Sequence, residues 1–243
     1  MKSLFNLATL FFLSIPMIAF IGCDKDDTAT PTGEEPTSLR VGLVGHWDFL
    51  GNANDLSTKG YHGAVVGAIP AKDRKGKDNS AFQFNGETDY IQLGNITSLG
   101  FGGFTPYTIA SWVKPDSAFG TIISKWNGGV KAGWYLRVKP DGITASYRNV
   151  VPWTANALEP IQPNKWYHLL TKYDGSQLYI YVNGELVAQD PFTSQPNDTQ
   201  TNVLVGALYS QHQVASFFKG VIDEVRIYDR DLTNDEIKWL ATH

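Results

Sequence analysis

Apolar and polar positions follow two different patterns along this chain. Residues 4–22 form one nearly unbroken apolar run, whereas residues from Gly42 onward form short runs in which apolar and polar side chains alternate. Glycine, asparagine, aspartate and proline separate these short runs. Alternation with a period of two is typical of strands that bury one face, and the separating residues are typical of turns. The pattern therefore predicts an all-β domain behind a hydrophobic leader.

The alternating runs predict many short strands and a single helix. Asn183-Gly184 joins two of the runs and predicts a tight hairpin, because both turn residues need a positive φ. Thr233 and Glu236 have the spacing of a capping box and predict a helix at the C-terminus. Short strands at this spacing indicate a sandwich or a barrel. The predicted strands are residues 43–49, 62–67, 81–84, 90–93, 107–114, 120–125, 134–139, 142–148, 166–173, 177–182, 185–189, 202–207 and 221–228.

The leader has the features of a secretory signal peptide. Lys2 precedes the apolar run, and the run ends at Gly22, directly before Cys23. A small residue before a lone cysteine resembles the lipobox of bacterial lipoproteins, although Phe20 replaces the usual leucine and Ile21 is bulky. The resemblance implies that residues 1–22 are removed and that Cys23 is lipidated. An uncleaved membrane anchor and ordinary secretion are the alternatives.

Residues 23–40 are rich in Thr, Pro, Gly and acidic residues, and we expect a flexible tether there because so little apolar surface cannot fold. The acidic residues after Cys23 resemble the export signals of surface-displayed lipoproteins. We therefore expect a lipid-anchored protein of the bacterial outer membrane or cell surface. Its folded domain is predicted to span residues 41–243.

Composition excludes several classes of protein. The net charge of −4 argues against a nucleic-acid-binding surface, which is normally basic. Cys23 is the only cysteine, so an intrachain disulfide and a cysteine-ligated zinc site are both impossible.

Five stretches of the domain resemble the bacterial laminin-G-like branch of the concanavalin A-like lectin/glucanase superfamily, in the order that the family shows. They are GLVGHWDF at residues 42–49 with the turns that follow it, AFQFNGETDYI at 81–91, YTIASWVKP at 107–115, WYHL at 166–169 continuing to YVNG at 181–184, and GVIDEVRIY at 220–228. The resemblance implies a jelly-roll sandwich of two antiparallel sheets with a short C-terminal helix.

The superfamily contains glucanases, but we expect no catalysis here. Their signature, Glu-x-Asp-x-x-Glu or a close variant, has its nearest counterpart in Glu87, Asp89 and Gln92, where glutamine replaces the acid. Asp223 and Glu224 are neighbours on one predicted strand, so alternation points them to opposite faces. The histidines show no metal-ligand spacing either.

Binding of extracellular carbohydrate is the function that we predict instead. Flat aromatic rings cover the apolar faces of sugars, while polar neighbours take the hydroxyl groups. The candidate binding residues lie at the ends of predicted strands or in the loops that follow them, where aromatic side chains stand beside glycines and amides. For Trp126 and Trp153 the alternative is simple packing, and a protein-binding or structural adhesion module with cell-surface partners is the alternative function, with a glycoside hydrolase third. The candidates are Trp126, Asn127, Tyr147, Arg148, Trp153 and His212.

A structural calcium ion is the cofactor that the resemblance implies. Alternation on the last strand places Asp223 beside Val221 and Val225 on an apolar face, where a carboxylate needs a partner. In related lectins and glucanases the matching aspartate resembles a calcium ligand, and its partners correspond here to Asp48 and Gly86. The alternative is that Asp223 accepts hydrogen bonds within the protein.

Overall fold

The computed structural model describes residues 33–117, 119–128, 132–139, 144–148, 154–156, 160–191, 199–211 and 213–243, with the side chains of 132, 144–148 and 154–156 excepted. Glu35–His243 form one compact unit, separate from Met1–Glu34. The unit begins before the predicted residue 41 because Leu39 is fully buried and Glu35 forms an ion pair with Arg226.

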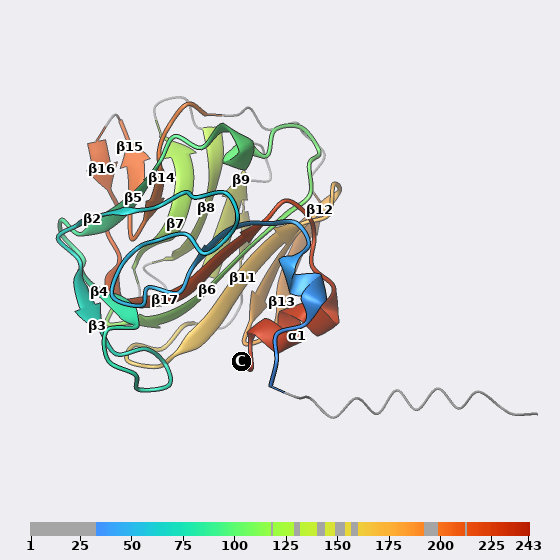
Figure 1. Ribbon diagram of the computed structural model, residues 1–243. Coiled ribbons are helices and arrows are strands. Elements are labelled where there is room, and N and C mark those ends of the chain that lie inside the picture. The colour runs from blue at the N-terminus through green and yellow to red at the C-terminus, as the bar shows by residue number, and fades with distance from the viewer. Residues whose placement is uncertain are drawn as a thin grey trace, which may run out of the picture. The chain divides into compact units, whose positions relative to one another are not determined.

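The unit is a sandwich of two sheets (Figure 1). Sheet A has eight strands, in the order β13-β12-β11-β6-β17-β4-β3 with β1 also paired to β17. Its strands are β1 (Leu43–Trp47), β3 (Ile69–Ala71), β4 (Ala81–Asn85), β6 (Tyr107–Pro115), β11 (Tyr167–Tyr173), β12 (Gln177–Val182), β13 (Glu185–Pro191) and β17 (Lys219–Tyr228). Because β17 pairs with both β1 and β4, the C-terminal strand closes onto the beginning of the domain.

Sheet B has nine strands, in the order β10-β9-β8-β7-β14-β5-β2, and β15 joins it with β16 beside β7. Its strands are β2 (Ala64–Val66), β5 (Tyr90–Gly94), β7 (Gly120–Asn127), β8 (Ala132–Val138), β9 (Thr144–Arg148), β10 (Thr154–Asn156), β14 (Val203–Val205), β15 (Leu208–Ser210) and β16 (Gln213–Ala215). The predicted jelly-roll sandwich is thereby confirmed, since strands far apart in the chain pair antiparallel within each sheet.

Each predicted run contains an observed strand. Some observed strands have no predicted counterpart, and all of these are very short. The four strands that the pattern did not predict, β3, β10, β15 and β16, are three residues long, which is too short for an alternation to be read. The predicted hairpin is present between β12 and β13, with Asn183 at φ 52° and Gly184 at φ 84°.

The main core lies between the two sheets and is built from their facing apolar side chains. Trp47, Phe84, Ile109 and Ile222 from sheet A meet Ile91, Ile123, Trp134, Leu136 and Val205 from sheet B. The buried indole of Trp134 donates to the carbonyl of Leu99 on the short 3-10 helix η2 (Thr97–Gly100), at 2.7 Å.

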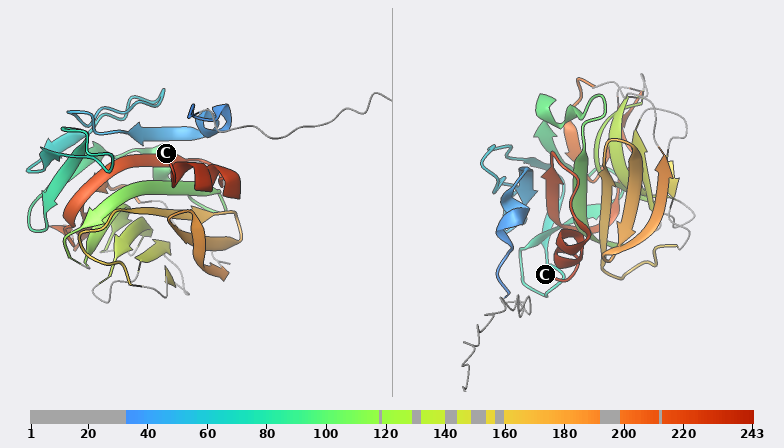
Figure 2. Two further views of the ribbon diagram at one scale, coloured as in Figure 1. Left: turned by 90° about the horizontal axis from the view of Figure 1, so that it is seen from below. Right: turned by 90° about the vertical axis from the view of Figure 1, so that its right-hand side faces the viewer.

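A second apolar cluster covers the outer face of sheet A. Leu39 on the 3-10 helix η1 (Thr37–Arg40) packs there with Leu170, Tyr228 and Leu240. The views in Figure 2 show η1 and the helix α1 (Asn234–Leu240) lying against this sheet. The predicted capping box of α1 is present, because Thr233 accepts from the amide of Glu236 and Glu236 accepts from that of Thr233. No helix in the described part of the chain is long and apolar enough to cross a membrane.

Candidate functional site

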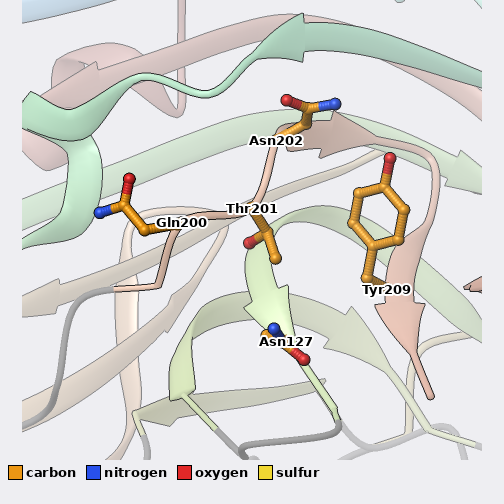
Figure 3. Close-up of a pocket in the computed structure, with 5 residues that line it drawn as sticks. All are labelled: Asn127, Gln200, Thr201, Asn202 and Tyr209. Atoms are coloured by element: carbon orange, nitrogen blue, oxygen red, sulfur yellow. The ribbon is translucent and has the colours of Figure 1, made fainter. Parts of the chain in front are cut away.

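One pocket of about 300 Å³ opens where the central strands β7 and β14 of sheet B end and begin, and it is lined by uncharged polar side chains. They come from three separate segments: the end of β7, the segment before β14, and β15 (Figure 3). The lining residues are Asn127, Gln200, Thr201, Asn202 and Tyr209.

Backbone pairing brings the two strands of the pocket together. Asn127 is the last residue of β7, and its Cα is paired with that of Tyr209 on β15, which runs parallel to β7. The amide of Gly128 donates to the carbonyl of Tyr209 at 3.1 Å, and the buried hydroxyl of Ser124 donates to the carbonyl of Ala207 at 2.8 Å. These bonds hold the half-buried Tyr209 beside the end of β7.

The third wall, residues 199–202, is held by bonds from neighbouring segments. The buried ammonium group of Lys125 donates to the carbonyl of Thr199. The amide of Asn95 donates to the Oε1 atom of Gln200 at 3.4 Å, and the hydroxyls of Thr199 and Thr201 lie 3.3 Å apart. The wall is thus fixed at its start, before β14 begins at Val203.

The pocket combines a flat ring with groups that both donate and accept hydrogen bonds. Each carboxamide of Asn127, Gln200 and Asn202 carries two donor hydrogens and an acceptor oxygen. The phenol of Tyr209 adds an apolar face and a hydroxyl. Such a set suits a ligand that presents several hydroxyl groups and an apolar face.

The strand pattern predicted that Trp126 lies in a loop. It lies instead inside β7, because this strand extends two residues further than expected. Its side chain is 8% exposed and packs with Leu208 and Tyr135, the latter ring lying edge-on at 5.6 Å between centroids. The structure therefore favours the packing alternative for Trp126. Its packing partner Leu208 directly precedes the pocket residue Tyr209 on β15.

The remaining binding candidates are only partly placed. Tyr147 and Arg148 lie on β9, where their Cα atoms pair with Tyr135 and Trp134. Their side chains lie outside the described part of the structure, as do Trp153, His212 and the predicted lipidation site Cys23. The structure thus brings Asn127 to the pocket and leaves the other predicted contacts as predictions.

Of the five lining residues, only Asn127 was predicted from the sequence, and the other four were missed. Gln200, Thr201 and Asn202 are ordinary loop residues by pattern, and nothing in the sequence connects them to Asn127, because the connection is the pairing of β14 with β7. Tyr209 belongs to a loop-like stretch with aromatic and amide residues, and that composition was a usable signal.

A second pocket, of about 220 Å³, lies on the outer face of sheet A and contains both Asp223 and Glu224. The expectation that these residues point to opposite faces is wrong. Glu224 has a φ of 49°, and the pairing of β17 with β6 is interrupted between Asp223 and Arg226. This β-bulge shifts the alternation by one residue. Val225 and Ile227 consequently belong to the core, while Asp223 lies on the outer face.

Both carboxylates are already paired with cations of the protein. The Oδ2 atom of Asp223, which is 2% exposed, accepts from Nη1 of Arg74 at 2.7 Å. Burial raises the pKa of the Asp223 carboxyl to about 7, although the Arg74 guanidinium opposes this rise. Burial would also raise the pKa of Glu224, but a hydrogen bond with His46 at 3.0 Å and the charge of Arg226 outweigh it and lower that pKa to about 2.

The residues proposed to hold calcium do not fit one ion. Asp48 and Asp223 line the same pocket, but the Asp48 carboxylate accepts the amide of Leu50 at 3.1 Å and that of Asp223 is bound by Arg74. Gly86 lies beyond the Asn85–Lys219 pair, at least four positions along β17 from Asp223, or roughly 13 Å. Ligands of one calcium ion lie within about 5 Å of each other. Calcium binding stays an untested prediction, and Asp223 instead has the internal partner that the alternative required.

Asp89, the central acid of the glucanase-like string, has a structural role in the turn between β4 and β5. Its carboxylate accepts from the amide of Asn85 at 3.0 Å and from the hydroxyl of Thr88 at 3.2 Å. Among the described residues, no group of three or more histidine, cysteine, aspartate or glutamate side chains could hold a metal ion.

Comparison with known proteins identifies a family and a set of similar folds. A family model described as the concanavalin A-like lectin/glucanases superfamily matches residues 85–238. Among curated protein sequences there is no match.

Three similar solved structures share the sandwich. Domain 4 of AbnA, an extracellular arabinanase from Geobacillus stearothermophilus solved with arabinotriose, is 23% identical, with a TM-score of 0.65 over 82% of this chain and 98% of that one. The binding domain of Paraclostridial Mosquitocidal Protein 1 is 18% identical, with a TM-score of 0.68 over 84% and 52%. The CBM40 domain of the Ruminococcus gnavus IT-sialidase, bound to α2,3-sialyllactose, is 23% identical, with a TM-score of 0.51 over 57% and 83%. At these identities the likeness shows the fold alone.

Proposed function

The chain belongs to the concanavalin A-like lectin/glucanase superfamily, and on that premise we propose that it is a non-catalytic carbohydrate-binding protein. The observation that carries the proposal is the pocket at the end of β7 in sheet B, where the Tyr209 ring stands beside three carboxamides and a threonine hydroxyl. A sugar unit fits this chemistry, because its ring presents an apolar C–H face to the phenol and its hydroxyls exchange hydrogen bonds with the amides.

The similar structures support this choice of ligand. Two of them are complexes with oligosaccharides, arabinotriose in one and α2,3-sialyllactose in the other. They share this chain's fold, and they establish that such a sandwich can present a sugar site.

The acidic residues support binding rather than hydrolysis. A retaining glycosidase needs one protonated acid and one free carboxylate that both reach the scissile bond. Here Asp223 is held by Arg74, Glu224 is held by His46 and Arg226, and Asp89 is held within its turn. Each carboxylate would have to give up a hydrogen-bond partner within the protein before it could act on a substrate.

Binding to a protein partner is the second candidate function. Two adjacent edge strands, β2 and β3, carry the exposed apolar side chains of Val65, Val66 and Ile69, which are 40%, 40% and 61% exposed. Exposed apolar patches on soluble proteins often mark interaction sites. This candidate predicts that a charged substitution on β2 abolishes partner binding and leaves sugar binding unchanged.

We propose that a lipid on Cys23 anchors the protein to the membrane. The signal-peptide pattern and the single cysteine before a Thr- and Pro-rich segment support it. Figure 1 shows η1, where the domain begins, at the opposite end of the sandwich from the β15–β16 hairpin next to the pocket.

The proposal is tested by electrophoresis of the protein through gels that contain soluble polysaccharides. The panel includes arabinan and xylan as uncharged polymers and polygalacturonan as an acidic one. We expect at least one gel to retard the wild-type protein and to release the Asn127→Ala/Tyr209→Ala variant. If no gel and no glycan array retains the wild-type protein, the protein-binding candidate takes precedence.

A further inference from the structure

Two lysines are buried in the part of the sandwich that the structure describes, and one of these two lies next to the pocket. Lys125 on β7 is fully buried, and its Cα is paired with that of the core residue Trp134. Lys172 on β11 is 9% exposed, lies on sheet A, and donates to the carbonyl of Leu232 at 2.8 Å. A buried ammonium group needs polar partners, because its desolvation is otherwise unfavourable.

The ammonium group of Lys125 donates to the carbonyl of Thr199, directly before the lining residues 200–202. Close packing reinforces this contact. A Cβ atom on Gly133 would lie 1.8 Å from the Lys125 carbonyl oxygen and 2.9 Å from Cγ2 of Thr199. At its other end the segment is fixed by the pairing of Leu204 with Ser124. Residues 200–202 are therefore held between two attachments to the same strand, β7.

We propose that Lys125 is a positioning residue of the binding pocket: its buried ammonium group fixes the wall that carries Gln200, Thr201 and Asn202. The role of Lys125 in binding rests on the proposed function, but the anchoring of residues 200–202 can be measured without a ligand. Removal of the ammonium group leaves a buried carbonyl without its charged donor, which favours movement of the wall toward solvent.

The test compares Lys125→Met with Lys172→Met, a matched control in which a buried lysine also loses a carbonyl partner. Hydrogen–deuterium exchange of the peptide covering residues 199–207 is measured in both variants and in the wild type. We expect faster exchange in Lys125→Met and wild-type exchange in Lys172→Met. Retardation in arabinan gels is the second readout, and we expect a loss of tenfold or more only in Lys125→Met.

Unchanged exchange of residues 199–207 in a folded Lys125→Met protein would overturn the inference. The same holds if both variants speed exchange equally, because the effect would then be general destabilisation. If the wild-type protein fails to bind arabinan or any other polysaccharide while exchange changes as expected, the proposed function fails and the anchoring by Lys125 stands.

A second inference comes from the other face of the molecule, where Arg74 lies at the tip of the loop between β3 and β4. The carboxylate of Asp73 accepts the amides of Lys75 and Lys77, each at 2.8 Å, and thereby fixes the loop. From this position Arg74 donates to Asp223 at 2.7 Å and to the carbonyl of His243 at 2.6 Å, and it lies 4.9 Å from the ring centroid of Trp112.

We infer that Arg74 supplies the cation at the place where the family resemblance implies calcium. A guanidinium group can satisfy several acceptors from one planar fork, as a metal ion does with its ligands. The bonds to β17 and to His243, together with the contact with Trp112 on β6, join the loop to sheet A and to the segment after α1. The structural consequence is a domain whose stability depends on Arg74 and not on calcium.

The test is thermal unfolding with excess chelator and with added calcium. We expect the wild-type melting temperature to be the same in both, and Arg74→Met to lower it by several degrees, because the buried Asp223 carboxylate loses its partner. Arg74→Met/Asp223→Asn is expected to recover part of that loss. Lys72→Met, which breaks an exposed ion pair with Asp78 in the same loop, is the control and is expected to change little. A wild-type protein that calcium stabilises and chelator destabilises would overturn the inference.

Discussion

His168 provides a sharp test of how the outer face of sheet A is packed. Its side chain is 2% exposed, and its ring centroid lies 5.4 Å from that of Trp112. Its Nδ1 atom has no hydrogen-bond partner among the described residues. Burial, assisted by the positive charges of Arg74 and Arg226 and opposed by Glu224, lowers the pKa of His168 to about 3.

This shift makes the folded state sensitive to acid in a defined pH range. Above about pH 6.5, the ordinary histidine pKa, the group is neutral in both states and contributes no pH dependence. Below pH 6.5 the unfolded chain binds a proton at His168 and the folded protein does not, so the free energy of unfolding decreases as the pH falls from 6.5 toward 3. The loss attributable to His168 is about 2 kcal/mol at pH 5 and approaches about 5 kcal/mol below pH 3, as an upper bound.

The assay is urea unfolding at pH 8 and pH 5 for the wild type and for His168→Leu. We expect the wild type to lose about 2 kcal/mol more than the variant over this interval. Other groups titrate in the same range, and Asp223 acts in the opposite sense because its pKa is raised. Only the difference between the two proteins is therefore assigned to His168.

A control variant, His62→Gln, removes an exposed histidine and is expected to behave like the wild type. Equal losses in the wild type and in His168→Leu would show that the imidazole accepts a proton where it lies. The packing described here for Trp112 and His168 would then be wrong.

Three further predictions concern single positions. Gly133→Ala is expected to lower the melting temperature by several degrees and to weaken sugar binding, because φ is 103° and a Cβ would meet the Lys125 carbonyl. Gly51→Ala is the control, because φ is 71° and nothing lies within 4 Å of its Cβ, so that this variant carries only the backbone strain. Thr233→Ala removes the N-cap of α1 and is expected to destabilise the protein by about 1 kcal/mol in urea unfolding, whereas no change would show that α1 is held by its apolar face alone. Cys23→Ser is expected to leave the protein out of the detergent phase or trapped as precursor, and unchanged detergent partitioning would show that the apolar run itself is the anchor.

The fold could be predicted from the sequence because its signals are local. The alternation of apolar residues, the Asn183-Gly184 turn and the Thr233 cap each act within a few residues, and each is present as expected. The strand ends were less accurate, and the error at the end of β7 was enough to assign Trp126 to a loop instead of a strand.

The sites could be predicted only in part because they depend on long-range geometry. One residue at positive φ, Glu224, shifts the alternation of β17 and places Asp223 on the outer face beside Arg74, which lies 149 positions earlier in the chain. The binding pocket likewise depends on the parallel pairing of Asn127 with Tyr209. Neither pairing leaves a pattern within a short window of sequence.

Binding of sugar through the Tyr209 ring, in the pocket at the end of β7, can be measured by calorimetric titration with arabinotriose and with fragments of any polysaccharide that retards the wild-type protein. Tyr209→Ala is compared with Tyr179→Ala, which removes a half-buried tyrosine from sheet A. By analogy with base–aromatic stacking, loss of the ring should weaken binding by about 1–3 kcal/mol. We expect this loss for Tyr209→Ala alone, and equal affinities in the wild type and both folded variants would show that the sugar does not stack on the Tyr209 ring.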